Sequence, residues 1–85
     1  MTNAPVVFFT DFGDSHYVGQ MKGVVLGIAP GVPLVDLTHA IAPQNVAEAA
    51  HVLNESVAAF PAGTVFVCVV DPGVGTARRG VAFFK

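Results

Sequence analysis

Three of the six acidic residues in this 85-residue sequence stand beside short apolar runs that are rich in β-forming residues. Asp11 follows the run at 6–10, Asp36 lies near the end of a run at 32–37, and Asp71 follows the run at 65–70. Continuous apolar runs of this length are typical of strands buried on both faces of a parallel sheet. Because ligands bind at the carboxyl ends of such strands, the pattern predicts a carboxylate-lined site at one edge of the sheet.

Each of these carboxylates also has a purely structural interpretation. Asp11 could cap the turn before the first helix. For Asp36 we favour a structural role, an Asx turn with the polar residues that follow it. The segment 71–76 could be an ordinary turn, since aspartate and proline begin turns and glycine ends them. Its proline and glycines, with two arginines close behind, exceed what a turn requires, and we favour a functional role for Asp71.

Several common kinds of site do not fit the sequence. The loop 71–76 lacks the lysine and the spacing of a P-loop, and the residues after the first strand are not a Gly-x-Gly-x-x-Gly turn. Dinucleotide binding of the usual kind is therefore not expected. His39 and Asp36 could share a metal ion, but no third ligand has suitable spacing, so we expect no metal site.

Composition excludes other classes of partner. The sequence has only four basic residues and a net charge of −2, which argues against a nucleic-acid surface. No apolar run reaches the ~18 residues that a membrane-spanning helix needs. The single cysteine, Cys68, excludes an internal disulfide and favours a cytoplasmic location.

Alternating strand and helix patterns predict an α/β fold with a parallel sheet and flanking helices. The glycines at 19, 23 and 27 form one row on the first helix, and we expect this row to permit close packing against the sheet. Periodicity predicts helices over 17–28 and 43–60, and strands over 6–10, 32–37, 65–70 and 80–84.

The composition indicates apolar faces that need further protein. Hydrophobic residues make up 53% of the sequence and charged residues 12%, whereas a typical soluble domain carries about 25% charge. Two helices do not cover both faces of a parallel sheet, and the sequence stops within the fourth predicted strand. We therefore expect residues 1–85 to be a truncated, partial α/β domain.

Five segments are more informative together, in their order and spacing, than any one of them alone. They are Thr10-Asp11-Phe12-Gly13, Tyr17-Val18-Gly19-Gln20-Met21-Lys22-Gly23, Val35-Asp36-Leu37-Thr38-His39, Phe60-Pro61-Ala62-Gly63-Thr64-Val65 and Val70-Asp71-Pro72-Gly73-Val74-Gly75-Thr76-Ala77-Arg78-Arg79. The ordered set resembles the S-adenosylmethionine hydroxide adenosyltransferase family, which is related to the fluorinases and chlorinases. In one departure, the first two segments are separated by one residue fewer than is usual in the family.

The resemblance implies a fold, an assembly and a reaction. It implies that the chain is the start of the Rossmann-like N-terminal domain of the family, without the C-terminal β domain of complete members. Those members are homotrimers whose active sites lie between subunits. The implied reaction is attack of water or hydroxide on the ribose C5′ of S-adenosyl-L-methionine, which gives adenosine and L-methionine without a cofactor.

The resemblance also implies roles for individual residues. Asp71 matches the carboxylate that orients the attacking water, and Arg78 matches the cation that fixes its geometry. Asp11 matches the carboxylate that accepts both ribose hydroxyls, and Gln44 stands where relatives carry a residue that packs on the nucleoside. Asp14 is the candidate for the contact with methionine. The family's catalytic histidine has no counterpart among the three histidines of this sequence.

Two alternatives to the hydrolase remain open. A non-catalytic nucleoside-binding or interaction fragment is one, because the third catalytic residue and the second domain are missing. A halogenase is the other, although relatives with that activity carry different residues in place of Asp71 and Arg78. We expect the isolated 85 residues to be catalytically inactive.

Overall fold

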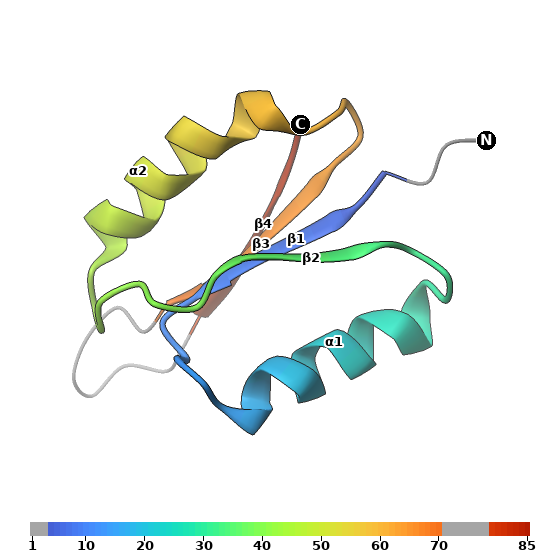
Figure 1. Cartoon of the computed structure of the whole chain (residues 1–85), viewed down its shortest axis with the longest axis horizontal. Coiled ribbons are helices and arrows are strands. Elements are labelled where there is room, and N and C mark those ends of the chain that lie inside the picture. Colours follow the sequence, from blue (N-terminus) through green and yellow to red (C-terminus); the bar gives the residue numbers. More distant parts are fainter. Residues whose placement is uncertain (1–3, 71–78) are drawn as a thin grey trace.

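The computed structural model describes residues 4–70 and 79–85, with residues 79–81 described by their backbone alone. A four-stranded sheet lies between two helices, α1 on one face and α2 on the other (Figure 1). The α/β fold with flanking helices is therefore confirmed. The elements are β1 (Val6–Thr10), α1 (His16–Ile28), β2 (Leu34–Thr38), α2 (Val46–Ser56), the 3₁₀ turn η1 (Val57–Ala59), β3 (Val65–Val70) and β4 (Arg79–Phe84).

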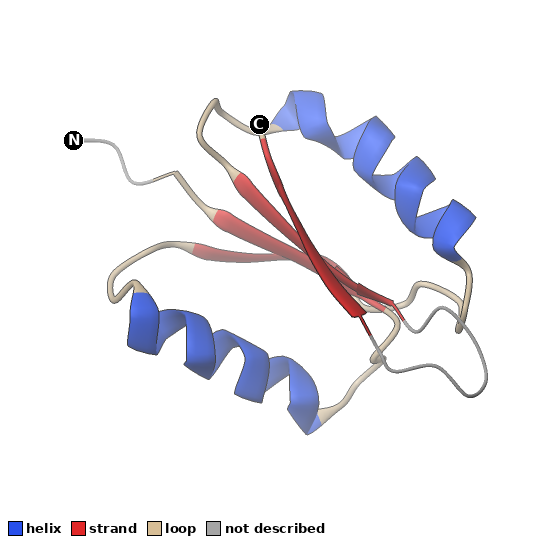
Figure 2. Ribbon diagram, turned by 180° about the vertical axis from the view of Figure 1, so that it is seen from behind, coloured by secondary structure: helices blue, strands red, loops and turns tan. Residues whose placement is uncertain are grey.

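The strand order is β2-β1-β3-β4, and β1 pairs in parallel with both β2 and β3 (Figure 2). The predicted parallel sheet holds for these three strands. In contrast, β4 runs antiparallel to β3, so the sheet as a whole is mixed. Only residues 71–78 separate β3 from β4, which is fewer than the dozen or so residues that a parallel crossover requires.

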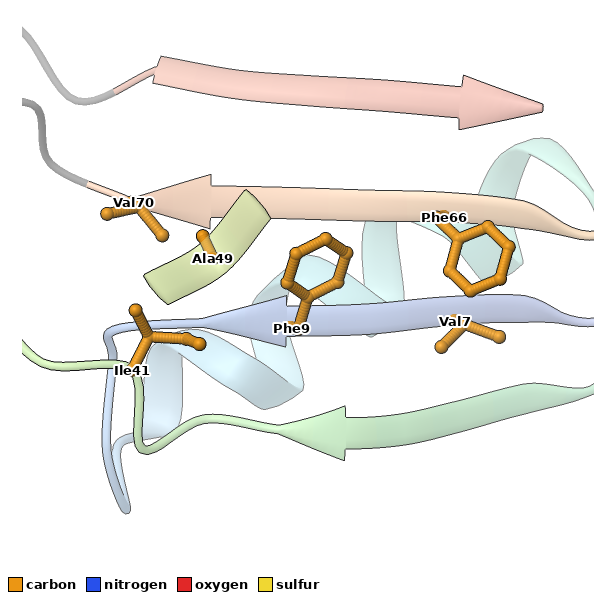
Figure 3. Packing of buried hydrophobic residues seen from close by; sticks show 6 residues of the cluster. All are labelled: Val7, Phe9, Ile41, Ala49, Phe66 and Val70. Atoms are coloured by element: carbon orange, nitrogen blue, oxygen red, sulfur yellow. The ribbon is translucent and has the colours of Figure 1, made fainter. Parts of the chain in front are cut away.

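The core lies on the α2 side of the sheet. All five residues of β1 are buried, as expected for a central strand covered on both faces. Because side chains alternate along a strand, Val7 and Phe9 point toward α2, where they meet Phe66 of β3 and Ala49 of α2 (Figure 3). Ile41 and Val70 complete the buried cluster.

Helix α2 is shorter than the predicted helix over 43–60, which is wrong at both ends. Gln44 has φ 65°, in the left-handed region, so the helix cannot extend back through it. Asn45 caps the helix instead, since its side chain accepts a hydrogen bond from the Glu48 backbone N–H at 2.9 Å. After η1, Phe60 is extended, the conformation favoured before a proline such as Pro61. The other predicted boundaries agree within two residues.

The expectation for the glycine row of α1 is wrong. A Cβ atom built at position 19, 23 or 27 would meet no atom within 4 Å outside the helix's own neighbouring backbone. The row therefore faces away from the sheet, and α1 has no fully buried residue. Val24 and Ile28 on the same helix are 65% and 80% exposed. Within residues 4–70 and 79–85, no helix is long and apolar enough to cross a membrane.

We predict that Gly23→Ala stabilises the chain by about 0.5–1 kcal/mol, because alanine in a helix interior loses less conformational entropy and meets no obstacle here. Urea unfolding followed by circular dichroism measures the change. Gly63→Ala is the matched control: Gly63 has φ +92° and its added Cβ would lie 3.3 Å from that of Ala4, so this variant should be destabilised. Equal effects of the two changes would contradict the outward orientation of the α1 row.

Candidate functional site at the β1–β3 edge

The point where the order of the sheet reverses lies between β1 and β3. Helix α1 follows β1 and α2 precedes β3, and the two helices lie on opposite faces (Figure 1). In open α/β sheets, ligands bind in the crevice outside the carboxyl ends of the strands at such a point. Asp11 stands there, since its backbone N–H donates to the Val69 carbonyl oxygen of β3 at 3.3 Å.

Asp11 lines a hollow of about 430 Å³ together with Phe12, Ser15 and Tyr17. The rings of Phe12 and Tyr17 lie with their centroids 6.1 Å apart and their planes tilted by 55°. Ser15 caps α1, because its hydroxyl oxygen accepts from the Tyr17 backbone N–H at 3.2 Å. The hollow thus combines one half-buried carboxylate with two aromatic rings, a composition suited to a sugar that carries a flat base.

The loop that carries Asp11 is held at each successive backbone N–H. Besides the bond from Asp11 to Val69, the Phe12 N–H donates to Thr10 Oγ1 at 3.1 Å, and the Gly13 N–H donates to the His39 carbonyl oxygen at 2.7 Å. Gly13 has φ +66°, a conformation that disfavours side chains and lets the chain turn toward α1. The loop is therefore pinned to both β3 and the end of β2.

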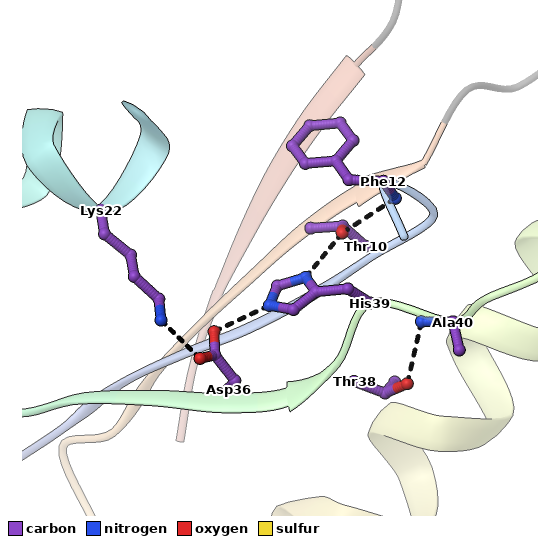
Figure 4. A network of polar contacts seen from close by, with 7 residues as sticks. All are labelled: Thr10, Phe12, Lys22, Asp36, Thr38, His39 and Ala40. Atoms are coloured by element: carbon purple, nitrogen blue, oxygen red, sulfur yellow. Dashed lines mark hydrogen bonds and ion pairs between the residues drawn. The ribbon is translucent and has the colours of Figure 1, made fainter. Parts of the chain in front are cut away.

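Asp36 does not join Asp11 at the ligand edge. It lies on the α1 face of β2 and forms an ion pair with Lys22 of α1, and its Oδ1 atom lies 2.7 Å from His39 Nε2 (Figure 4). The hydrogen bond from Lys22, and next the one from His39, lowers the pKa of Asp36 below its ordinary value of 3.8. The expected Asx turn is not what Asp36 forms, because Thr38 closes this turn by accepting from the Ala40 N–H at 3.0 Å.

A lowered pKa makes the Asp36 contacts sensitive to acid. Their contribution to stability is present above pH 3.8 and is lost as the pH falls through the lower folded-state value. We predict that Asp36→Asn destabilises the chain at pH 7 and that the difference from wild type shrinks as the pH falls below 3.8. Urea unfolding over a pH series that starts at 7 and continues below 3.8 measures this. Glu55→Gln, at an exposed pair with His51, should have a smaller effect at pH 7. A difference that does not shrink as the pH falls below 3.8 would contradict the prediction.

The remaining predicted site residues lie in different places. Asp71 and Arg78 lie outside the described residues. Asp14 is exposed and borders a second hollow of about 550 Å³, next to Lys22 and His39. Gln44 is exposed in the loop before α2 and borders neither this hollow nor the one beside Asp11.

The Cys68 thiol and metal binding are the other candidate chemistries of this region. Burial raises the pKa of the Cys68 thiol, and the charge of Asp11 adds to the rise, so the thiol is a poor nucleophile at neutral pH. Among residues 4–70 and 79–85, no three His, Cys, Asp or Glu side chains gather in a way that could hold a metal ion.

Sequence reasoning missed Thr10 and Lys22 as residues that organise this region. Thr10 is fully buried, and its hydroxyl lies 2.7 Å from His39 Nδ1. A signal was present, since a threonine that ends a strand buried on both faces needs a hydrogen-bond partner. Lys22 carried no comparable signal, because its partner Asp36 lies 14 residues away on another element.

These features define an α/β domain with a candidate ligand site, centred on the Asp11 carboxylate, at the switch point of its parallel strands. The sequence matches the family described as the S-adenosylmethionine (SAM) hydroxide adenosyltransferase N-terminal domain over residues 6–84. The chain belongs to this family.

Known relatives agree with this assignment. The chain is 51% identical over 79 residues to an (R)-S-adenosyl-L-methionine hydrolase of Thermus thermophilus, with 92% of this chain and 31% of the relative aligned. It is 41% identical over 81 residues to a fluorinase of an Actinoplanes species, covering 94% of this chain and 27% of that enzyme. A crystal structure of a conserved hypothetical protein from Thermus thermophilus superposes with a TM-score of 0.75 at 51% identity, covering 89% of this chain and 32% of that one. The chain thus spans less than a third of the length of each.

Proposed function

We propose that this chain forms part of an enzyme that hydrolyses S-adenosyl-L-methionine to adenosine and L-methionine. The position of Asp11 carries the proposal: it is a half-buried carboxylate at the switch point, with two aromatic rings beside it. Its two oxygens can accept the two adjacent hydroxyls of a ribose, and aromatic rings stack on bases. The 51% identity to a hydrolase of this substrate supports the same conclusion.

The proposed reaction is a single displacement at C5′ of the ribose. The water oxygen forms a bond to C5′ while the C5′–S bond breaks and its electron pair stays on the methionine sulfur. The proton that the water loses passes to the Asp71 carboxylate. A sulfonium leaves readily without protonation, so the protein must chiefly hold the water in line and orient it. We assign the water to Asp71, the orientation of Asp71 to Arg78, and the ribose to Asp11. Asp14 would contact the methionine and Gln44 the nucleoside.

Adjacency of strand ends supports the pairing of Asp11 with Asp71. Thr10 and Val69 are partners in the parallel ladder, and Asp11 continues β1 beside the end of β3. Asp71 is the next residue after Val70, the last residue of β3. A ribose held by Asp11 would therefore lie close to the end of β3, and Asp71 is the next residue in the sequence.

We further propose that the protein acts as a homotrimer in the cytoplasm, without a cofactor. Uncovered apolar surfaces support an assembly: Val24 and Ile28 of α1 are exposed, and an apolar groove of about 490 Å³ runs beside Leu53 and Phe83. Because the chain spans 31% of its hydrolase relative, we propose that the 85 residues alone are inactive. Light scattering measures the oligomeric state.

A chimera tests the reaction. Residues 6–84 replace the matching segment of the Thermus thermophilus hydrolase, and adenosine and methionine are quantified by chromatography. Both sulfonium epimers are assayed, since the relative's name specifies the R form. We expect equal amounts of the two products. Asp11→Asn should raise KM about 10–100-fold, the size of a lost charged hydrogen bond, while Glu55→Gln on α2 should not change it.

Three results would contradict the proposal. A folded chimera that binds the substrate without turnover would favour the nucleoside-binding alternative. Halide-dependent formation of a 5′-halo-nucleoside would favour a halogenase, to which the 41% identity with a fluorinase lends support. Unchanged KM in Asp11→Asn would remove Asp11 from the ribose site.

A further inference from the structure

A chain of hydrogen bonds runs from the loop of Asp11 to helix α1 (Figure 4). The Phe12 backbone N–H donates to Thr10 Oγ1 at 3.1 Å, and Thr10 Oγ1 lies 2.7 Å from His39 Nδ1. His39 Nε2 lies 2.7 Å from Asp36 Oδ1, and Lys22 pairs with the other carboxylate oxygen. The chain thus joins β1, β2 and α1 through side chains.

The partners determine where the hydrogens lie. An ionised Asp36 only accepts, and the lowering of its pKa keeps it ionised, so His39 Nε2 must carry the hydrogen. In the neutral ring, Nδ1 is then an acceptor, and the Thr10 hydroxyl donates to it. The Thr10 oxygen in turn accepts from Phe12. Every donor therefore points toward Asp36, and each bond has one donor and one acceptor.

His39 acts on the loop at two points. Its ring fixes the Thr10 hydroxyl, which receives the Phe12 N–H, and its own carbonyl oxygen receives the Gly13 N–H at 2.7 Å. These two amides directly follow Asp11. The Thr10 side chain is fully buried, whereas the His39 side chain is 15% exposed, so the bond between them is shielded from water.

We propose that Thr10, His39 and Asp36 are positioning residues that hold the Asp11 carboxylate in the geometry that binds ribose. This proposal rests on the proposed function, because it takes the ligand of Asp11 to be the ribose of the substrate. None of the three residues needs to touch the substrate. They act by fixing the two peptide groups after Asp11. The ion pair between Asp36 and Lys22 anchors the other end of this hydrogen-bond chain to α1.

Thr10→Val tests the proposal in the chimera defined above, because valine keeps the shape of threonine and removes the hydroxyl. We expect KM to rise about tenfold, roughly one net hydrogen bond, with kcat within about twofold, since ribose is held alike in ground and transition states. Thr10→Ser keeps the hydroxyl, so its KM should lie within about twofold of the value for the unsubstituted chimera. Thr38→Val is the matched control. The Thr38 hydroxyl also accepts from the backbone N–H two residues later, that of Ala40, but Thr38 is not a member of the hydrogen-bond chain.

A second pair of variants covers the case in which Thr10→Val does not fold. His39→Asn places an acceptor where Nδ1 lies but loses the contact with Asp36, so it should raise KM by less than Thr10→Val does. His39→Gln places its amide near Nε2 and leaves Thr10 without an acceptor, so it should resemble Thr10→Val. Equal effects of these two variants, or an effect of Thr38→Val as large as that of Thr10→Val, would overturn the proposal.

Measurements on the 85-residue chain separate this proposal from the proposed function. Nitrogen NMR should show His39 with its hydrogen on Nε2, and Thr10→Val should accelerate amide exchange at Phe12 and Gly13 more than at Ala40. If the wild-type chimera does not hydrolyse the substrate while these signals appear, the proposed function fails and the network stands. If the chimera is active and the signals are absent, the positioning role is overturned.

Discussion

Replacing Asp71 with asparagine is expected to lower kcat for adenosine release by about 10²–10⁴-fold, the usual contribution of a positioned acid–base group. Asparagine has the same shape but no charge, so it can neither accept the proton of the attacking water nor orient it as strongly. The measurement is steady-state adenosine release by the chimera that carries residues 6–84. Binding of the substrate, for which we propose Asp11, should change by much less.

Two controls make this result specific. Arg78→Lys keeps the positive charge but loses the planar, two-pronged hydrogen bonding of arginine, so it should lower kcat less than Asp71→Asn. Glu55→Gln removes one carboxylate from the exposed surface of α2 and should leave kcat unchanged. A rise in KM with an unchanged kcat in Asp71→Asn would mean that Asp71 binds the substrate and does not act on the water.

Replacing Phe66 with alanine is expected to destabilise the chain by about 3–5 kcal/mol. Phe66 is fully buried in β3, and its ring meets that of Phe60 edge-on, with centroids 5.4 Å apart. Alanine would leave a cavity between β3 and the α2 side of the core and remove this aromatic pair. A domain of this size has a total stability of roughly 4–13 kcal/mol, so the substitution should remove a large fraction of it.

Urea unfolding monitored by circular dichroism measures this loss. Phe84→Ala is the matched control, because Phe84 lies on the neighbouring strand β4 with 82% of its surface exposed, and its loss should cost about 0.5 kcal/mol or less. If the two substitutions lowered the free energy of unfolding equally, Phe66 would not be buried in the core that α2 covers.

The local features of the fold were accessible from the sequence. The strands at 6–10 and 65–70 appear with the predicted bounds, because each is a continuous apolar run of β-forming residues. Asp11 was placed at the carboxyl end of the first strand for a similar reason, since it is the first residue after that buried strand. The motifs also indicated the family that the comparison over residues 6–84 shows.

Predictions failed where a residue's role depends on what lies opposite it. The glycine row of α1 was assigned to the sheet, yet it faces outward, because periodicity defines a stripe without saying what covers it. For Asp36 we favoured a structural role, which it has, but as an ion pair with Lys22 and not as an Asx turn. Its pairing with Lys22 depends on the packing of α1 against β2, which brings together residues 14 positions apart.

For Asp11 itself, the chain sequence establishes the carboxylate, the strand before it and the glycine turn after it, because these depend on neighbours within a few residues. Its surroundings depend on long-range contacts. The order β2-β1-β3 places Asp11 beside the end of β3, where Asp71 follows in the chain, and the bond between Thr10 and His39 joins residues 29 positions apart. Hydrogen bonds and packing between distant segments are set by the folded geometry, and a local pattern of residues carries no information about which segments will meet.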